Sequence, residues 1–167
     1  MTGRPRQRRQ SAGILLYRFP SDDGRVPQVL LGHMGGPMWK RRDVGAWSIP
    51  KGGYTDEEEA FAAALREFEE EVGLPVPAER FVDLGEVQQA SGKYVRAWAA
   101  EGDLDPATAV SNTFEVEWPP GSGRLESFPE FDRVAWFGPE EAITKIVTAQ
   151  AAFVERLLAA LSTEPAT

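Results

Sequence analysis

Seven glutamates lie within GGYTDEEEAFAAALREFEEEVGL, residues 52–74, and the spacing of the later ones points to a cation site. At about 100° per residue, Glu67, Glu70 and Glu71 share one face of a helix, with Glu70 about 60° to one side of Glu67 and Glu71 about 40° to the other, while Glu69 points elsewhere. Three carboxylates within one turn raise one another's pKa unless a cation neutralises them. Their oxygens suit Mg²⁺ or Mn²⁺. A solvated acidic face is the other interpretation of this cluster taken alone.

A helix over residues 56–72 is expected to present these carboxylates. Thr55 followed three residues later by Glu58 is the pattern of a capping box, which gives Glu58 a structural explanation. Gly73 supplies the expected left-handed end, and Pro75 prevents continuation. A narrow apolar stripe, about 130° from the carboxylate face, is expected to pack on a core; it comprises Phe61, Leu65, Phe68 and Val72.

The complete spacing from Gly52 to Leu74 is G-x5-E-x7-R-E-U-x-E-E-x-G-U, where U is apolar, and every specified position is filled. Seven fixed letters at about 6% usage each would match by chance on the order of once in 10⁸ to 10⁹ starts. This pattern is the signature of the Nudix hydrolases, and the chain resembles that family. The resemblance implies an α/β fold, a Nudix-type α/β/α sandwich around a mixed β-sheet. It also implies hydrolysis of a nucleoside diphosphate linked to another group.

The same resemblance implies roles for residues of the motif. Glu67, Glu70 and Glu71 would bind Mg²⁺, with Mn²⁺ as a substitute, bridged to a substrate diphosphate. The backbone carbonyl of Gly52 would complete the metal shell. Arg66 would orient a glutamate through a charge-assisted hydrogen bond. We therefore expect Glu70, Glu67 and Arg66 to be catalytic.

A further acid often acts as base or metal ligand in this family, from a loop before a late strand. The segment FPEFDRVAWF is placed similarly, so Glu130 is the candidate catalytic acid, with Asp132 behind it. A solvated loop acid is an equally open interpretation of Glu130. The sole histidine, His33, is expected to be structural. Trp39 and Trp118 are candidates for stacking on a base, whereas core packing is favoured for Trp47.

Basic residues near the motif are candidates for binding substrate phosphates. Lys51 stands in IPKG, which is similar to a motif of the dinucleoside polyphosphate and diphosphoinositol polyphosphate hydrolases of the family. A lysine there can hold a phosphate as a point charge. Lys40, Arg41 and Arg42 are expected to form a rim for a polyphosphate, with solvated loop charge as the alternative.

Composition narrows the function classes. The 167 residues carry a net charge of −8, although the first ten, MTGRPRQRRQ, hold four arginines and no acid. An acidic body disfavours nucleic-acid binding, but the basic arm leaves contact with RNA open beside a solvated tail. The absence of cysteine excludes disulfides, zinc–thiolate sites and thiol nucleophiles. No apolar run approaches the ~20 residues of a membrane span and no signal peptide is recognisable, so a cytoplasmic protein without a membrane partner is expected.

One Nudix hydrolase domain is expected over residues 11–162, after a basic, disordered arm over 1–10 and before a frayed tail over 163–167. Strands and helices are mixed without the alternation of a doubly wound sheet. Residues 121–130 are expected to form a loop. KGG, residues 51–53, is expected to end the strand at 46–50. The expected strands are 11–19, 27–34, 46–50, 81–90, 93–102, 112–120 and 131–137, and the other helices are 138–147 and 149–162.

The sequence therefore predicts a Mg²⁺-dependent pyrophosphohydrolase whose partner is a small nucleotide, with a dinucleoside polyphosphate as the preferred substrate. A nucleoside triphosphate pyrophosphatase, including one for oxidised nucleotides, remains open. So does a nucleotide-binding Nudix module without turnover. Loss of a metal-binding glutamate would have favoured the module, and none is lost. The oligomeric state is not determined by these patterns.

Overall fold

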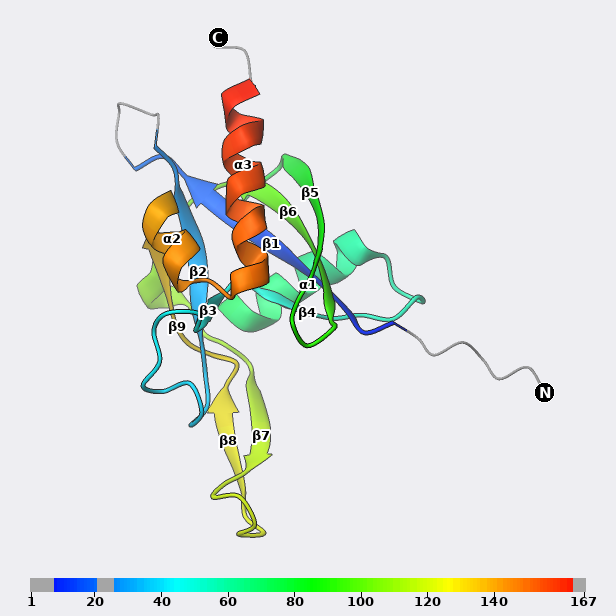
Figure 1. Ribbon diagram of the computed structural model, residues 1–167, viewed down its shortest axis with the longest axis vertical. Coiled ribbons are helices and arrows are strands. Elements are labelled where there is room, and N and C mark those ends of the chain that lie inside the picture. Colours follow the sequence, from blue (N-terminus) through cyan, green and yellow to red (C-terminus); the bar gives the residue numbers. More distant parts are fainter. Residues whose placement is uncertain (1–7, 21–25, 164–167) are drawn as a thin grey trace, which may run out of the picture.

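The computed structural model describes residues 8–20 and 26–163, and within this part of the chain seven strands form one mixed β-sheet (Figure 1). They are β1 (Gln10–Arg18), β2 (Gln28–Met34), β3 (Trp47–Ser48), β4 (Lys51–Gly53), β5 (Phe81–Gln88), β6 (Tyr94–Glu101) and β9 (Phe131–Phe137). The main path runs β3-β2-β1-β6-β5, while β4 pairs with β1 and β9 pairs with β2. Strands β1 and β6 are parallel, and the other pairs are antiparallel.

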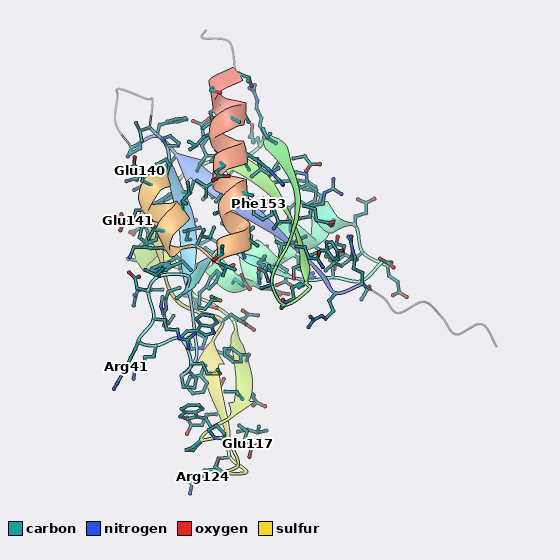
Figure 2. The ribbon with its side chains drawn as sticks, viewed as in Figure 1. Arg41, Glu117, Arg124, Glu140, Glu141 and Phe153 are labelled. Carbon is teal, nitrogen blue, oxygen red and sulfur yellow. The ribbon has the colours of Figure 1, made fainter. Side chains whose placement is uncertain are left out.

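Helices cover both faces of this sheet. Helix α1 (Ala60–Val72) packs on one face, and α2 (Pro139–Lys145) and α3 (Ala151–Thr163) pack on the other, where Phe153 of α3 is fully buried (Figures 1 and 2). Strand β1 serves both cores, because Ile14 and Leu16 lie in the core under α1 while Leu15 and Tyr17 lie in the core under α3. The expected α/β/α sandwich around a mixed sheet is confirmed.

A two-stranded hairpin, β7 (Thr113–Glu117) and β8 (Leu125–Pro129), projects from the sandwich beside the connection 35–46 between β2 and β3 (Figure 1). The expectation of a loop over 121–130 is therefore wrong for 125–129. The short LESFP segment has no clear strand pattern by itself, and it becomes a strand because it forms a hydrogen-bonded ladder with β7. The Gly123 amide donates to the Glu117 carboxylate (2.8 Å) at the outer end of the hairpin, where Figure 2 labels Glu117 and Arg124.

The segment KGG, expected to break a strand, is instead β4. It pairs with β1 through Ser11–Gly53, Ala12–Gly52 and Gly13–Lys51. Glycine is unfavourable in strand interiors, but it allows another backbone or side chain to approach closely. The tertiary environment therefore overrides the local preference, and β4 becomes the strand over which α1 lies.

The structure also corrects the start of the long helix. Helix α1 begins at Ala60 rather than at residue 56, and its N-cap, Glu59, makes no side-chain capping hydrogen bond. The predicted capping box between Thr55 and Glu58 is absent, because the Glu58 carboxylate binds Arg66 instead. The expected left-handed end at Gly73 is present, with φ of 82°.

The ends of the chain differ partly from expectation. Residues 1–7 of the predicted arm and residues 164–167 of the predicted tail lie outside the described residues. Gln10 already belongs to β1, and Arg8 pairs with Glu86 at 2.8 Å while its guanidinium lies 4.2 Å from the centroid of the Tyr94 ring.

In the described part of the chain, no helix is both long and apolar enough to cross a membrane.

Candidate functional site

Helix α1 is fixed to β4 by two of its glutamates. The Glu71 carboxylate accepts a hydrogen bond from the Lys51 amide at 2.8 Å. A Cβ added to Gly52 would lie 2.0 Å from the Glu67 carboxyl carbon, so only glycine leaves room for that side chain. Phe68 of α1 is fully buried in the core, and Glu67 and Glu71 of the same helix lie against β4.

Exposure differs among the three carboxylates that the helical wheel places together. Glu71 is buried, the Glu67 side chain retains 12% of its exposure, and the Glu70 side chain retains 42%. Glu69 is exposed. The carboxylate face therefore runs from a buried end at β4 to an open end at Glu70, and a ligand would reach it from the open side.

Arg66 connects the acids of this face. Its guanidinium donates two hydrogen bonds to Glu58, both at 2.9 Å, one to Glu67 at 2.9 Å and longer ones to Glu70 at 3.3 Å. The expected contact between Arg66 and a glutamate is thus present three times. Glu58, which the sequence assigned to a capping box, instead holds Arg66 in place.

The pKa values of the ionisable groups at the buried end of the cluster are shifted. Burial raises the pKa of the Glu71 carboxyl well above its usual range; the Lys51 amide and charge oppose this rise, while Glu67 and Glu130 add to it. Burial also raises the pKa of Glu67, against the effect of its hydrogen bond from Arg66. Burial and the neighbouring Lys93 charge lower the pKa of Lys51. Additional positive charge at this point would stabilise the ionised carboxylates.

These residues fit a divalent cation in their chemistry. The carboxylates of Glu67, Glu70 and Glu71 and the carbonyl of Gly52 are hard oxygen donors, and the space above Gly52 already admits a carboxylate. As they stand, no three His, Asp or Glu side chains in the described part of the chain are arranged to hold a metal. Arg66 binds Glu67 and Glu70, and Glu71 binds the Lys51 amide, so these oxygens would have to turn toward a cation.

Glu130 lies between the hairpin and β9, where its charge acts on both Glu71 and Lys51. Its backbone is fixed by hydrogen bonds from the Gly35 amide and to the Asn112 carbonyl, both at 2.9 Å. The structure thus brings the predicted late acid near the carboxylates of α1. Its role as base or metal ligand stays a prediction.

The Asp132 carboxylate is paired with His33. Its two carboxylate oxygens lie 2.9 and 3.0 Å from Nδ1 of His33, and the opposite ring nitrogen lies 2.7 Å from the carbonyl oxygen of Arg42. His33 is fully buried in β2, at the edge of Trp47. The expected structural character of His33 agrees with this placement.

The inner of two hollows is lined by one carboxylate of the site, Glu71. The inner hollow, about 360 Å³, is lined by residues that include Glu71, Ser111, Phe131 and Asp132. The outer hollow, about 450 Å³, lies between the connection 35–46 and the hairpin; it is lined by Gly36, Pro37, Lys40, Trp118, Glu126, Phe128, Pro129 and Asp132. Asp132 lines both hollows.

The predicted basic rim is only partly assembled. Lys40 lines the outer hollow, but Arg41 points outward from the connection 35–46 (Figure 2), and the Arg42 guanidinium lies over the Trp39 ring, 5.5 Å from its centroid. Neither Arg41 nor Arg42 lines the two hollows. Lys40 is therefore the residue of the predicted rim that lines a hollow, and a role for residues 40–42 in binding a polyphosphate stays a prediction.

Sequence reasoning missed the aromatic walls of the hairpin. Phe114 and Phe128 are cross-strand neighbours whose ring centroids lie 6.2 Å apart. Apolar residues alternate with polar ones in TFEVEW, and this pattern does predict one covered face. It does not reveal that the covering element is the distant connection 35–46.

A NUDIX domain model matches residues 7–157, so the chain belongs to the NUDIX domain family. Together with the complete motif at 52–74, this membership makes the protein a Nudix hydrolase that acts on phosphoric anhydride bonds. A search of curated protein sequences found no match.

Solved structures share the fold at low identity. An Ap4A hydrolase from C. elegans, solved as a binary complex, matches with a TM-score of 0.65 and 20% identity over 92% of this chain and 99% of that one. RenU, a Nudix hydrolase from M. smegmatis, matches with a TM-score of 0.58 and 24% identity over 96% and 89%. The NUDIX domain of Shewanella oneidensis NrtR, in complex with ADP ribose, matches with a TM-score of 0.60 and 15% identity over 92% and 88%.

Proposed function

We propose that this protein is a Mg²⁺-dependent pyrophosphohydrolase that prefers a dinucleoside polyphosphate. The observation that carries the proposal is the position of Lys51, half-buried in β4 next to the α1 carboxylates and close enough to Glu71, Glu130 and Glu67 for their charges to interact. A lysine at this point offers a phosphate contact in addition to those that a cation on the carboxylates provides.

In the proposed site, Glu67, Glu70, Glu71 and the Gly52 carbonyl hold the cation, and Arg66 orients Glu67 and Glu70. When bound, the cation neutralises charge on the phosphates and lowers the pKa of a water. Glu130 is the proposed acid opposite α1, and Lys51 and Lys40 are the proposed phosphate contacts. The relation in fold to an Ap4A hydrolase is compatible with this substrate class. A cytoplasmic location is part of the proposal.

Lys51 is proposed to discriminate between substrates by the length of their phosphate chain. A longer polyphosphate carries charge beyond the phosphates that the cation reaches, and Lys40 in the outer hollow is the proposed contact for that charge. A nucleoside triphosphate is shorter and would use fewer of these contacts. A diphosphoinositol polyphosphate would require more cationic side chains than line the two hollows.

The test is a substrate panel with Mg²⁺ that contains diadenosine tetraphosphate, nucleoside triphosphates, oxidised nucleotides, sugar nucleotides and capped RNA. Diadenosine tetraphosphate should give the highest kcat/KM. Lys51→Ala should raise KM for it more than for ATP, while Arg124→Ala, an exposed basic residue at the end of the hairpin, should change neither. A clear preference for a triphosphate, or an equal effect of Lys51→Ala on both substrates, would refute the substrate assignment.

A further inference from the structure

The outer hollow is built by contacts between the hairpin and the connection 35–46. A Cβ on Gly35 would meet the Pro129 carbonyl oxygen at 1.8 Å, and one on Gly36, whose φ is +98°, would meet the Phe114 ring at 2.9 Å. The Gly35 amide donates to the Glu130 carbonyl at 2.9 Å. Two adjacent glycines therefore let the two elements touch at their base and leave the hollow open beyond it.

Two aromatic residues, Trp118 and Phe128, line this hollow. Residues 114, 116 and 118 alternate onto one face, and the register of β7 with β8 places Phe128 opposite Phe114 on that face. Trp118 lines the outer hollow and also an adjoining apolar hollow of about 160 Å³ that reaches Met38 and Trp39. Figure 2 shows ring side chains gathered between the hairpin and the connection. Such surfaces can stack on the π-face of any base.

The polar residues of the outer hollow are placed for the rest of a nucleotide. Lys40 provides a positive charge beside the carboxylates of Glu126 and Asp132, and Asp132 also lines the inner hollow. A volume of about 450 Å³ lies within the ordinary range for small-molecule sites. A base stacked on Trp118 would thus share the hollow with Lys40, which can contact its adjoining phosphate.

We propose that the outer hollow is a nucleobase subsite, in which Trp118 stacks on one base of the substrate and Lys40 contacts the adjoining phosphate. The inference rests on the proposed function for the identity of the complete substrate, a nucleotide with a second nucleoside beyond the cleaved anhydride. It adds a specificity element formed by the β7–β8 hairpin, which lies outside the 52–74 motif.

Binding of two simple probes separates the base from the phosphate. AMP and ribose 5-phosphate carry the same phosphate, but only AMP has a base, so calorimetry should show tighter binding of AMP to the wild-type protein. Trp118→Ala should remove most of this advantage, since stacking accounts for about a 5- to 150-fold change in affinity per base. Trp118→Phe should retain part of it. Lys40→Ala should weaken both probes alike.

Leu125→Ala is the matched control. Leu125 lies on the opposite face of the hairpin, is 69% exposed and pairs with Glu117, so its truncation should leave the ratio of the two affinities unchanged. Thermal unfolding and circular dichroism would verify that each variant is folded. Equal binding of AMP and ribose 5-phosphate to the wild type, or an AMP advantage that persists in folded Trp118→Ala, would overturn the subsite.

Catalysis then links the subsite to the substrate. With diadenosine tetraphosphate, Trp118→Ala should raise KM at least about fivefold with little change in kcat, whereas hydrolysis of base-free inorganic tripolyphosphate, if measurable, should be unaffected. If the wild type hydrolyses no dinucleoside polyphosphate but still shows the Trp118-dependent preference for AMP, the substrate proposal fails and the subsite stands. If hydrolysis occurs without that preference, the subsite fails alone.

Discussion

His33 and Asp132 form a pair that joins β2 to the start of β9, with Nδ1 of the buried imidazole 2.9 Å from one carboxylate oxygen and 3.0 Å from the other. Nε2 of the same ring faces the Arg42 carbonyl oxygen at 2.7 Å. The two ring nitrogens of His33 thus each lie within hydrogen-bond distance of an oxygen from another part of the chain. This one side chain thereby ties the connection 35–46 to the strand that borders both hollows.

The first prediction concerns this pair. His33→Leu should lower the free energy of unfolding by about 1–3 kcal/mol, because it removes the hydrogen-bonding partner of the Arg42 carbonyl and of the Asp132 carboxylate. Asp132→Asn keeps an acceptor and should cost less. Urea unfolding of the two variants measures the difference. A His33→Leu protein as stable as the wild type would show that the pair does not hold the connection in place.

Removal of divalent cations is the second test. Chelation should abolish turnover, and Mg²⁺ or Mn²⁺ should restore it, since the α1 carboxylates cannot by themselves neutralise phosphate charge. Chelation should also leave circular dichroism at its starting value, because α1 is held by the Phe68 core and by the Glu71–Lys51 hydrogen bond. Full activity in excess chelator would refute the metal-dependent mechanism.

The third prediction separates the glutamates of α1. Glu70→Gln and Glu71→Gln should each lower kcat on the order of a hundredfold or more, as expected for ligands that carry transition-state charge. Glutamine at 71 can still accept the hydrogen bond from the Lys51 amide, so the fold should be retained. Glu69→Gln should do little, because that side chain is exposed. Steady-state kinetics with equal losses at all three positions would contradict the assignment.

The fourth prediction uses two adjacent glycines of β4. Gly52→Ala places a methyl group 2.0 Å from the Glu67 carboxyl carbon, so Glu67 must move and kcat should fall by at least tenfold. Gly53→Ala is the control, since its nearest neighbour would be the Gln10 carbonyl oxygen at 3.8 Å, an ordinary contact. Similar rates for the two variants would mean that the position of Glu67 against β4 is unimportant for activity.

The fifth prediction concerns the acid outside α1. Glu130→Gln should lower kcat because the Glu130 charge acts on both Lys51 and Glu71 from outside α1. Its backbone hydrogen bonds to Gly35 and Asn112 do not involve the side chain, so stability should be retained. An unchanged pH–rate profile and kcat would remove Glu130 from the catalytic residues.

The sequence by itself determined the family, the approximate positions of most elements and the helix that carries the carboxylates. These features depend on local spacing: the period of the apolar stripe, the left-handed glycine at 73 and the filled motif at 52–74. Strand β9 matches its predicted bounds, 131–137, because a compact apolar segment there is bounded by turn residues.

Only the tertiary structure decided how these parts meet. Three features depend on α1 lying over β4. KGG forms β4, Glu58 binds Arg66 rather than capping its helix, and Glu71 is buried against Lys51. Two contacts join residues far apart in the chain. Gly36 lies against Phe114 of the hairpin, and His33 pairs with Asp132. Local periodicity carries no information about such contacts, because they arise from packing between elements rather than within them.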